Sequence, residues 1–126
     1  MKIIQKSYVI NASIEKVWDA LVNPKTIEKW SGSKAVMSDI QGSDFKLWNG
    51  DIWGKNIEIQ KESKLVQEWY GGKWKEPSIV TFTLKKVGDG VQLDLKHINV
   101  PEDIESFDTG WDDYYLGEIK KLLESN

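Results

Sequence analysis

Between residues 34 and 99 the sequence consists of short segments with a period of two, joined by tight turns. Turn signals such as "NGD" at 49–51 and "GDG" at 88–90 leave too few residues for the crossover that parallel strands need. The region therefore predicts consecutive antiparallel strands. The expected strands are 34–40, 44–49, 51–60, 64–70, 78–87 and 91–100.

The segments on either side change period. Residues 2–10 alternate enough to be a first strand, and two short helices should follow it. Ser13 is a suitable N-cap for the first helix, while Asn23 and Pro24 mark the start of the second, which ends at Trp30. After Pro101 a helical stripe appears, formed by Ile104, Phe107, Trp111, Tyr115, Ile119 and Leu122.

Together these elements predict an α+β fold in a single domain, residues 1–126. An antiparallel sheet of about seven strands should wrap around the long C-terminal helix, with the two short helices between the first and second strands. Because a twisted sheet closes imperfectly around one helix, an apolar cavity is expected between them.

Composition excludes several classes of function. The chain has no cysteine and one histidine, so disulfides, thiolate nucleophiles and the usual zinc sites are not expected. All 17 basic residues are lysine and the net charge is −3, which argues against nucleic acid or an anionic membrane as partner. We expect no metal and no cofactor. The N-terminus lacks a signal-peptide core or membrane span, which indicates a cytoplasmic protein.

Four segments carry a family resemblance: "IEKVWDAL" (14–21), "NPKTIEKW" (23–30), "NGDIWGKNIEIQKESKLVQEW" (49–69) and "GWDDYYLGEIKKLLE" (110–124). Their order resembles the START-like, helix-grip (SRPBCC) superfamily that includes the birch-pollen allergen. Within it, the chain is similar to the AHSA-like family, homologues of the activator of heat-shock-protein-90 ATPase. The similarity spans essentially the whole chain, and the Gly-Trp-x-x-Tyr-Tyr pattern resembles the C-terminal domain of the eukaryotic activator.

The resemblance implies the helix-grip fold. It leaves function open, because the superfamily uses this fold for lipid carriage, hormone binding, polyketide cyclisation and chaperone regulation. The eukaryotic activator has a separate N-terminal domain that contributes to chaperone binding, and we expect this chain to lack it. No family motif here identifies catalytic residues.

Aromatic residues and the single histidine are the candidates for lining the cavity. His97 shares one strand face with Leu93 and Leu95, so its ring should point toward the helix. It could orient a ligand or act as an acid or base. The favoured interpretation is a satisfied histidine bonded to Tyr115, an aspartate or backbone. The expected cavity residues are Trp30, Trp69, Phe82, His97, Trp111 and Tyr115.

Other residues carry smaller expectations. Trp48 alternates against its strand neighbours and should point outward, where it could form a surface patch with Trp53. Asp112 and Asp113 should belong to a solvated helix face. Glycine is costly inside a helix, so Gly110 and Gly117 suggest that neighbouring side chains approach the backbone closely.

Three functions follow, in order of preference. The first is a non-catalytic protein that binds a small apolar or aromatic ligand in the cavity. The second, close behind, is a protein-interaction module that modulates the ATPase of a heat-shock-90-type chaperone. The third is a cyclase- or hydrolase-like enzyme that uses His97 as general base.

Overall fold

The computed structural model describes residues 3–100 and 104–125. Six antiparallel strands form one sheet in the order β1-β6-β5-β4-β3-β2. The strands are β1 (Ile3–Ile10), β2 (Asp44–Leu47), β3 (Ile52–Gln60), β4 (Lys64–Gly71), β5 (Ser78–Val87) and β6 (Gly90–Ile98). Two helices, α1 (Ile14–Val22) and α2 (Pro24–Ser31), lie between β1 and β2, and the turn η1 (Trp48–Gly50) joins β2 to β3.

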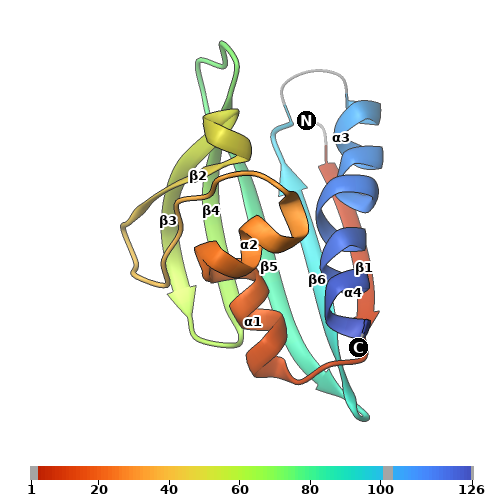
Figure 1. Ribbon diagram of the computed structural model, residues 1–126. Coiled ribbons are helices and arrows are strands. Elements are labelled where there is room, and N and C mark those ends of the chain that lie inside the picture. Colours follow the sequence, from red (N-terminus) through yellow and green to blue (C-terminus); the bar gives the residue numbers. More distant parts are fainter. Residues whose placement is uncertain (1–2, 101–103, 126) are drawn as a thin grey trace.

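The C-terminal helix runs from Ile104 to Glu124 as three consecutive segments. These are α3 (Ile104–Gly110), the π-helical turn η2 (Trp111–Leu116) and α4 (Gly117–Glu124). Figure 1 shows this helix along the β1 and β6 side of the sheet, with α1 and α2 beside it over the same face. The predicted α+β helix-grip fold is confirmed.

The number of strands differs from the prediction by one. Residues 34–40 form no strand and make a single bridge, in which Val36 and Lys46 exchange two backbone hydrogen bonds of 2.9 Å. Beyond it the chain turns, and Gly42 and Ser43 bond instead to the backbone of Asn56. Because Met37 turns inward and Ile40 is 65% exposed, the apolar residues here do not line one face of a ladder.

The helix caps match the sequence prediction. The Ser13 side chain accepts the backbone N–H of Lys16, and Asn23 accepts that of Lys25 with Pro24 at the first helical position. These caps direct the apolar faces of α1 and α2 into a core with the sheet and the C-terminal helix. Fully buried core residues from each layer include Val17, Leu21, Ile27, Leu93 and Ile119.

The C-terminal helix is fixed to the edge strand β1 by polar side chains. Lys6 Nζ and the Tyr8 hydroxyl both donate to the Asp112 carboxylate. Farther along, Lys120 Nζ donates to the carbonyl oxygen of Val9 at 2.6 Å. Burial opposes ionisation of Asp112, but the bonds from Lys6 and Tyr8 lower its pKa. The side chain of Asp112 nevertheless stays 42% exposed and Asp113 is exposed, so both acids lie on the solvated helix face, as predicted.

The two helical glycines have different surroundings. The Gly117 N–H bonds to the carbonyl oxygen of Asp112 across the π turn, and a Cβ on Gly117 would lie 2.0 Å from that oxygen. A Cβ on Gly110 would meet nothing closer than Tyr114 Cδ2, at 4.0 Å. The expected close approach of neighbouring side chains is found at neither glycine. At Gly117 the close contact is made by the backbone of the helix itself.

This difference predicts opposite effects for one substitution. Gly110→Ala should raise the free energy of unfolding by up to about 1 kcal/mol, because alanine is the better helix former. Gly117→Ala should lower it by roughly 1–3 kcal/mol, because the backbone must shift to admit the methyl group. Urea denaturation followed by circular dichroism measures both. Equal stability of the two variants would mean that the π turn does not require glycine.

Candidate functional site

An aromatic cluster occupies the space between the sheet and the C-terminal helix. Tyr115 lies at its centre, with its ring centroid 4.5 Å from that of Trp30 and 4.7 Å from that of Trp111. Trp69 of β4 reaches Trp111 at 5.0 Å. The structure brings together all six residues that the sequence singled out, and each is at most 4% exposed: Trp30, Trp69, Phe82, His97, Trp111 and Tyr115.

Beside this cluster is a pocket of about 350 Å³. Three of the six residues, Trp69, Trp111 and Tyr115, line it, while the other three do not. The remaining lining residues come from the η1 turn, the start of β3 and the first turns of the C-terminal helix. They are Trp48, Ile52, Ser106, Phe107, Gly110 and Tyr114.

Periodicity could have indicated part of this lining. Phe107, Gly110, Trp111 and Tyr114 fall at helical spacing, so they form one stripe that faces the pocket. Tyr115 also lines the pocket but lies deeper in the core, where its side chain is 1% exposed. The side chain of Ile104, the first residue of the predicted stripe, lies outside the described residues.

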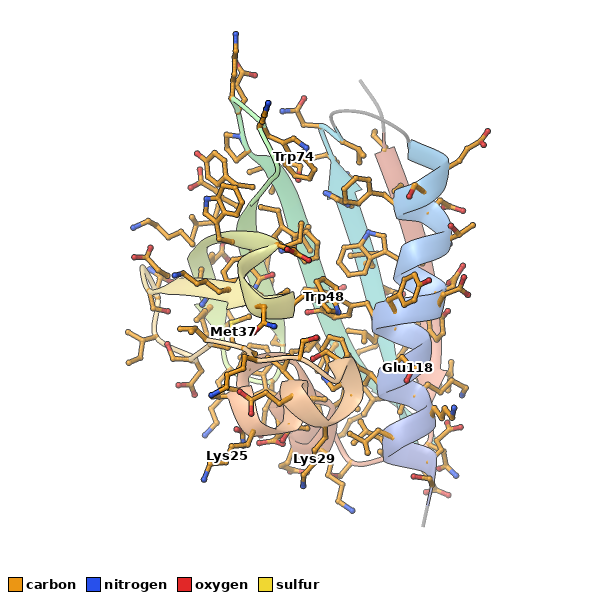
Figure 2. The ribbon with its side chains drawn as sticks, turned by 45° about the horizontal axis from the view of Figure 1, so that its top comes forward. Lys25, Lys29, Met37, Trp48, Trp74 and Glu118 are labelled. Atoms are coloured by element: carbon orange, nitrogen blue, oxygen red, sulfur yellow. The ribbon has the colours of Figure 1, made fainter. Side chains whose placement is uncertain are left out.

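The side chain of Trp48 does not point in the predicted direction. It begins the η1 turn with a φ of 49°, in the left-handed region that bulky residues rarely adopt, and Asn49 follows with a φ of 59°. This backbone turns the indole toward Trp30 and Tyr115, with ring centroids 6.4 and 6.0 Å away. Trp48 lies between the η1 turn and the C-terminal helix in Figure 2. It therefore does not point outward.

Trp53 lies on the opposite face of the sheet. It stacks on its cross-strand neighbour Tyr70, with ring centroids 6.2 Å apart and an angle of 11° between the planes. Tyr70 is adjacent in β4 to the inward-facing Trp69, so the pair faces outward. The predicted patch of Trp48 with Trp53 does not form, because the two rings lie on opposite faces.

Buried hydrogen bonds hold Trp69 and Trp111, two of the three tryptophans of the pocket wall. Trp111 Nε1 donates to His97 Nδ1 at 3.1 Å, and Trp69 Nε1 donates to Gln67 Oε1 at 2.8 Å. Gln67 in turn donates to Asn56 Oδ1 at 2.8 Å. The sequence analysis missed Gln67 and Asn56, although period-two alternation places Gln67 on the same strand face as Trp69.

Both ring nitrogens of His97 are hydrogen-bonded inside the protein, as favoured from the sequence. The partners are Trp111 and Ser78, and not Tyr115, an aspartate or backbone. Because the indole of Trp111 donates to Nδ1, the neutral ring carries its hydrogen on Nε2 and donates it to Ser78 Oγ, 2.8 Å away. Burial lowers the pKa of His97 to about 4. Because Nε2 already carries a hydrogen and Nδ1 accepts from Trp111, the ring has no free nitrogen to take the Ser78 proton, and this geometry does not make His97 a general base.

Among residues 3–100 and 104–125, no group of three or more histidine or acidic side chains is placed to hold a metal ion. Within the same ranges, no helix is long and apolar enough to cross a membrane.

Comparison with known proteins identifies the family to which the chain belongs. The family described as "Activator of Hsp90 ATPase homolog 1-like protein" matches residues 11–124. The chain belongs to this family. The mouse "Activator of 90 kDa heat shock protein ATPase homolog 2" is 27% identical over 120 residues, which are 92% of this chain and 36% of the relative. The human "homolog 1" is 23% identical over 115 residues, or 88% and 34% of the two chains. The chain thus spans about a third of these relatives.

Two solved structures resemble this chain over nearly the whole length of both chains. An HSP90 activator from Plasmodium falciparum superposes with a TM-score of 0.90 at 27% identity, covering 98% of this chain and 96% of the other. A protein of Cytophaga hutchinsonii gives a TM-score of 0.80 at 31% identity, with 98% and 94% covered. The helix-grip architecture of the chain agrees with both.

Proposed function

We propose that this AHSA1-family chain acts by binding and not by catalysis, and that its pocket takes a small apolar or aromatic ligand. The observation that carries the proposal is the pocket of about 350 Å³ whose nine lining residues include six aromatic side chains. Ligand sites have volumes of roughly 300–1,000 Å³ and mostly apolar walls with few polar groups. In this proposal Trp69, Trp111 and Tyr115 contact the ligand, and Trp30, Phe82 and His97 support them from behind.

A thermal-shift screen with neutral aromatic and aliphatic compounds tests this function. A ligand at a hundred times its Kd should stabilise the native chain by about 2.7 kcal/mol and raise the melting temperature by several degrees. The same compounds should change the tryptophan fluorescence, because three of the seven tryptophans line the pocket. A panel that changes neither quantity would contradict the proposal.

We propose as a second function that the chain modulates the ATPase of a heat-shock-90-type chaperone. The match to the Plasmodium falciparum HSP90 activator supports it, since that similarity covers 96% of the activator's own chain. The mouse and human relatives are also activators by name, although this chain spans only about a third of each.

A coupled ATPase assay with purified chaperone tests the second function. Adding the chain at micromolar concentrations should give a saturable change in the rate that a chaperone-specific inhibitor abolishes. The Gly110→Leu variant described below separates the two proposals, because filling the pocket should remove ligand binding without altering the surface elsewhere. An unchanged rate, together with no co-purification, would count against chaperone modulation.

A further inference from the structure

The lining of the pocket is uncharged. Its residues are aromatic, aliphatic or small, and the only ionisable groups among them are tyrosine hydroxyls. Four acids adjoin lining residues along the helix. Asp108 and Asp112 are paired with Lys6 of β1 at 3.3 and 2.8 Å, and Glu105 and Asp113 are exposed to solvent. A charged ligand would therefore find no counter-ion among the residues that line the pocket.

Trp69, Trp111 and Tyr115, in the pocket wall, offer a ligand no free hydrogen-bond donor. The indole N–H groups of Trp69 and Trp111 are both used inside the protein, on Gln67 and His97. The Tyr115 hydroxyl has no partner among the described residues, but it is buried and so adds no donor to the pocket surface. What these three side chains present to a ligand is ring carbon.

From these observations we infer that the pocket selects uncharged aromatic molecules and rejects anionic ones. This inference rests on the proposed ligand-binding function and names its ligand class. A planar ring gains contact with the aromatic walls, whereas an anionic group would be dehydrated without a partner. A polar substituent can only be tolerated at the rim, where Tyr114 is 66% exposed.

Gly110 is the position at which the pocket can be closed. It lines the pocket, and a Cβ there would meet only Tyr114 Cδ2, at 4.0 Å. A larger side chain would extend into the space that a ligand needs without displacing the backbone. Trp53 supplies the matched control, because it is a partly exposed aromatic residue on the other face of the sheet.

A matched pair of fluorescent probes tests the inference. N-phenylnaphthylamine is neutral, and anilinonaphthalene sulfonate has a similar ring system with an added sulfonate. Titrations of the full chain, followed by energy transfer from tryptophan, give a Kd for each probe. The neutral probe should bind at least about tenfold more tightly. Gly110→Leu should weaken its binding by about tenfold or more, while Trp53→Ala should leave it unchanged. Melting curves establish that each variant is folded, and Gly110→Ala replaces Gly110→Leu if that variant is not.

The outcomes distinguish a wrong ligand class from a failure of the proposed ligand-binding function. If the sulfonate, or a trimethylammonium analogue, binds as tightly as the neutral probe and Gly110→Leu weakens both, the pocket binds ligands but the inferred class is wrong. If neither probe binds, or if Gly110→Leu changes nothing, the ligand-binding function fails as well. Preference for the neutral probe, lost in Gly110→Leu alone, supports both.

Discussion

Trp69→Ala is expected to lower the free energy of unfolding by about 3–5 kcal/mol, the range for deleting a buried aromatic side chain. Trp69 is 2% exposed, and its ring packs against Phe45, His97 and Trp111. Its loss would leave a cavity and also an unpaired acceptor on Gln67. Because domains of this size have total stabilities of roughly 5–15 kcal/mol, this loss is a large fraction of the total and should lower the urea midpoint markedly. Urea denaturation followed by circular dichroism measures the change.

Two further variants show which interactions account for the loss of stability in Trp69→Ala. Trp69→Phe keeps a ring but removes the N–H that Gln67 accepts, so it should cost about 1–3 kcal/mol. Trp53→Ala removes a partly exposed ring stacked on Tyr70, and should cost about 1 kcal/mol or less. Similar losses for Trp69→Ala and Trp53→Ala would mean that the aromatic cluster is not a centre of stability.

Acidification is expected to destabilise the protein through His97, by about 2 kcal/mol between pH 7 and pH 5. The pKa of His97 falls from 6.5 to about 4 in the native state because the ring is buried. Between these values the unfolded chain binds a proton that the native chain does not, so the stability contributed by His97 is complete above pH 6.5. It is lost progressively as the pH falls toward 4. Chemical denaturation at a series of pH values measures this slope.

Because His97 is the chain's single histidine, the assignment can be checked directly. His97→Gln should shift the absolute stability and flatten its slope between pH 5 and pH 7. The carboxyl groups with lowered pKa values, on Asp112 and Glu124, titrate below this window. Nitrogen NMR should show the hydrogen on Nε2 at neutral pH. A slope that persists in His97→Gln, or a hydrogen on Nδ1, would contradict the network with Trp111 and Ser78.

Much of the fold could be predicted because local periodicity records burial. Alternation along β5 and β6, the caps at Ser13 and Asn23, and the stripe of the last helix each depend on residues close in sequence. The extra strand at 34–40 was predicted because alternation looks the same whether or not a segment pairs with another strand. In this segment only Val36 forms a β-bridge.

The candidate site was predictable in part for the same reason. Period-two and helical spacing direct His97, Trp111 and Tyr115 inward, and the structure brings them together. The sequence left open which way Trp69 faces, and it is buried beside them. The direction of the Trp48 side chain was predicted wrongly, because it depends on a left-handed backbone in a turn and not on alternation.

The sequence by itself determined the order of strands and helices, the antiparallel connections and the inward faces, because these follow from propensities and patterns within a few residues. Only the tertiary structure decided which buried polar groups meet. Ser78 and Trp111 reach His97 from 19 and 14 residues away, and such pairs leave no local pattern. It also distinguished Gly110, which opens the pocket, from Gly117, which closes the π turn, since backbone geometry alone separates two otherwise equivalent helical glycines.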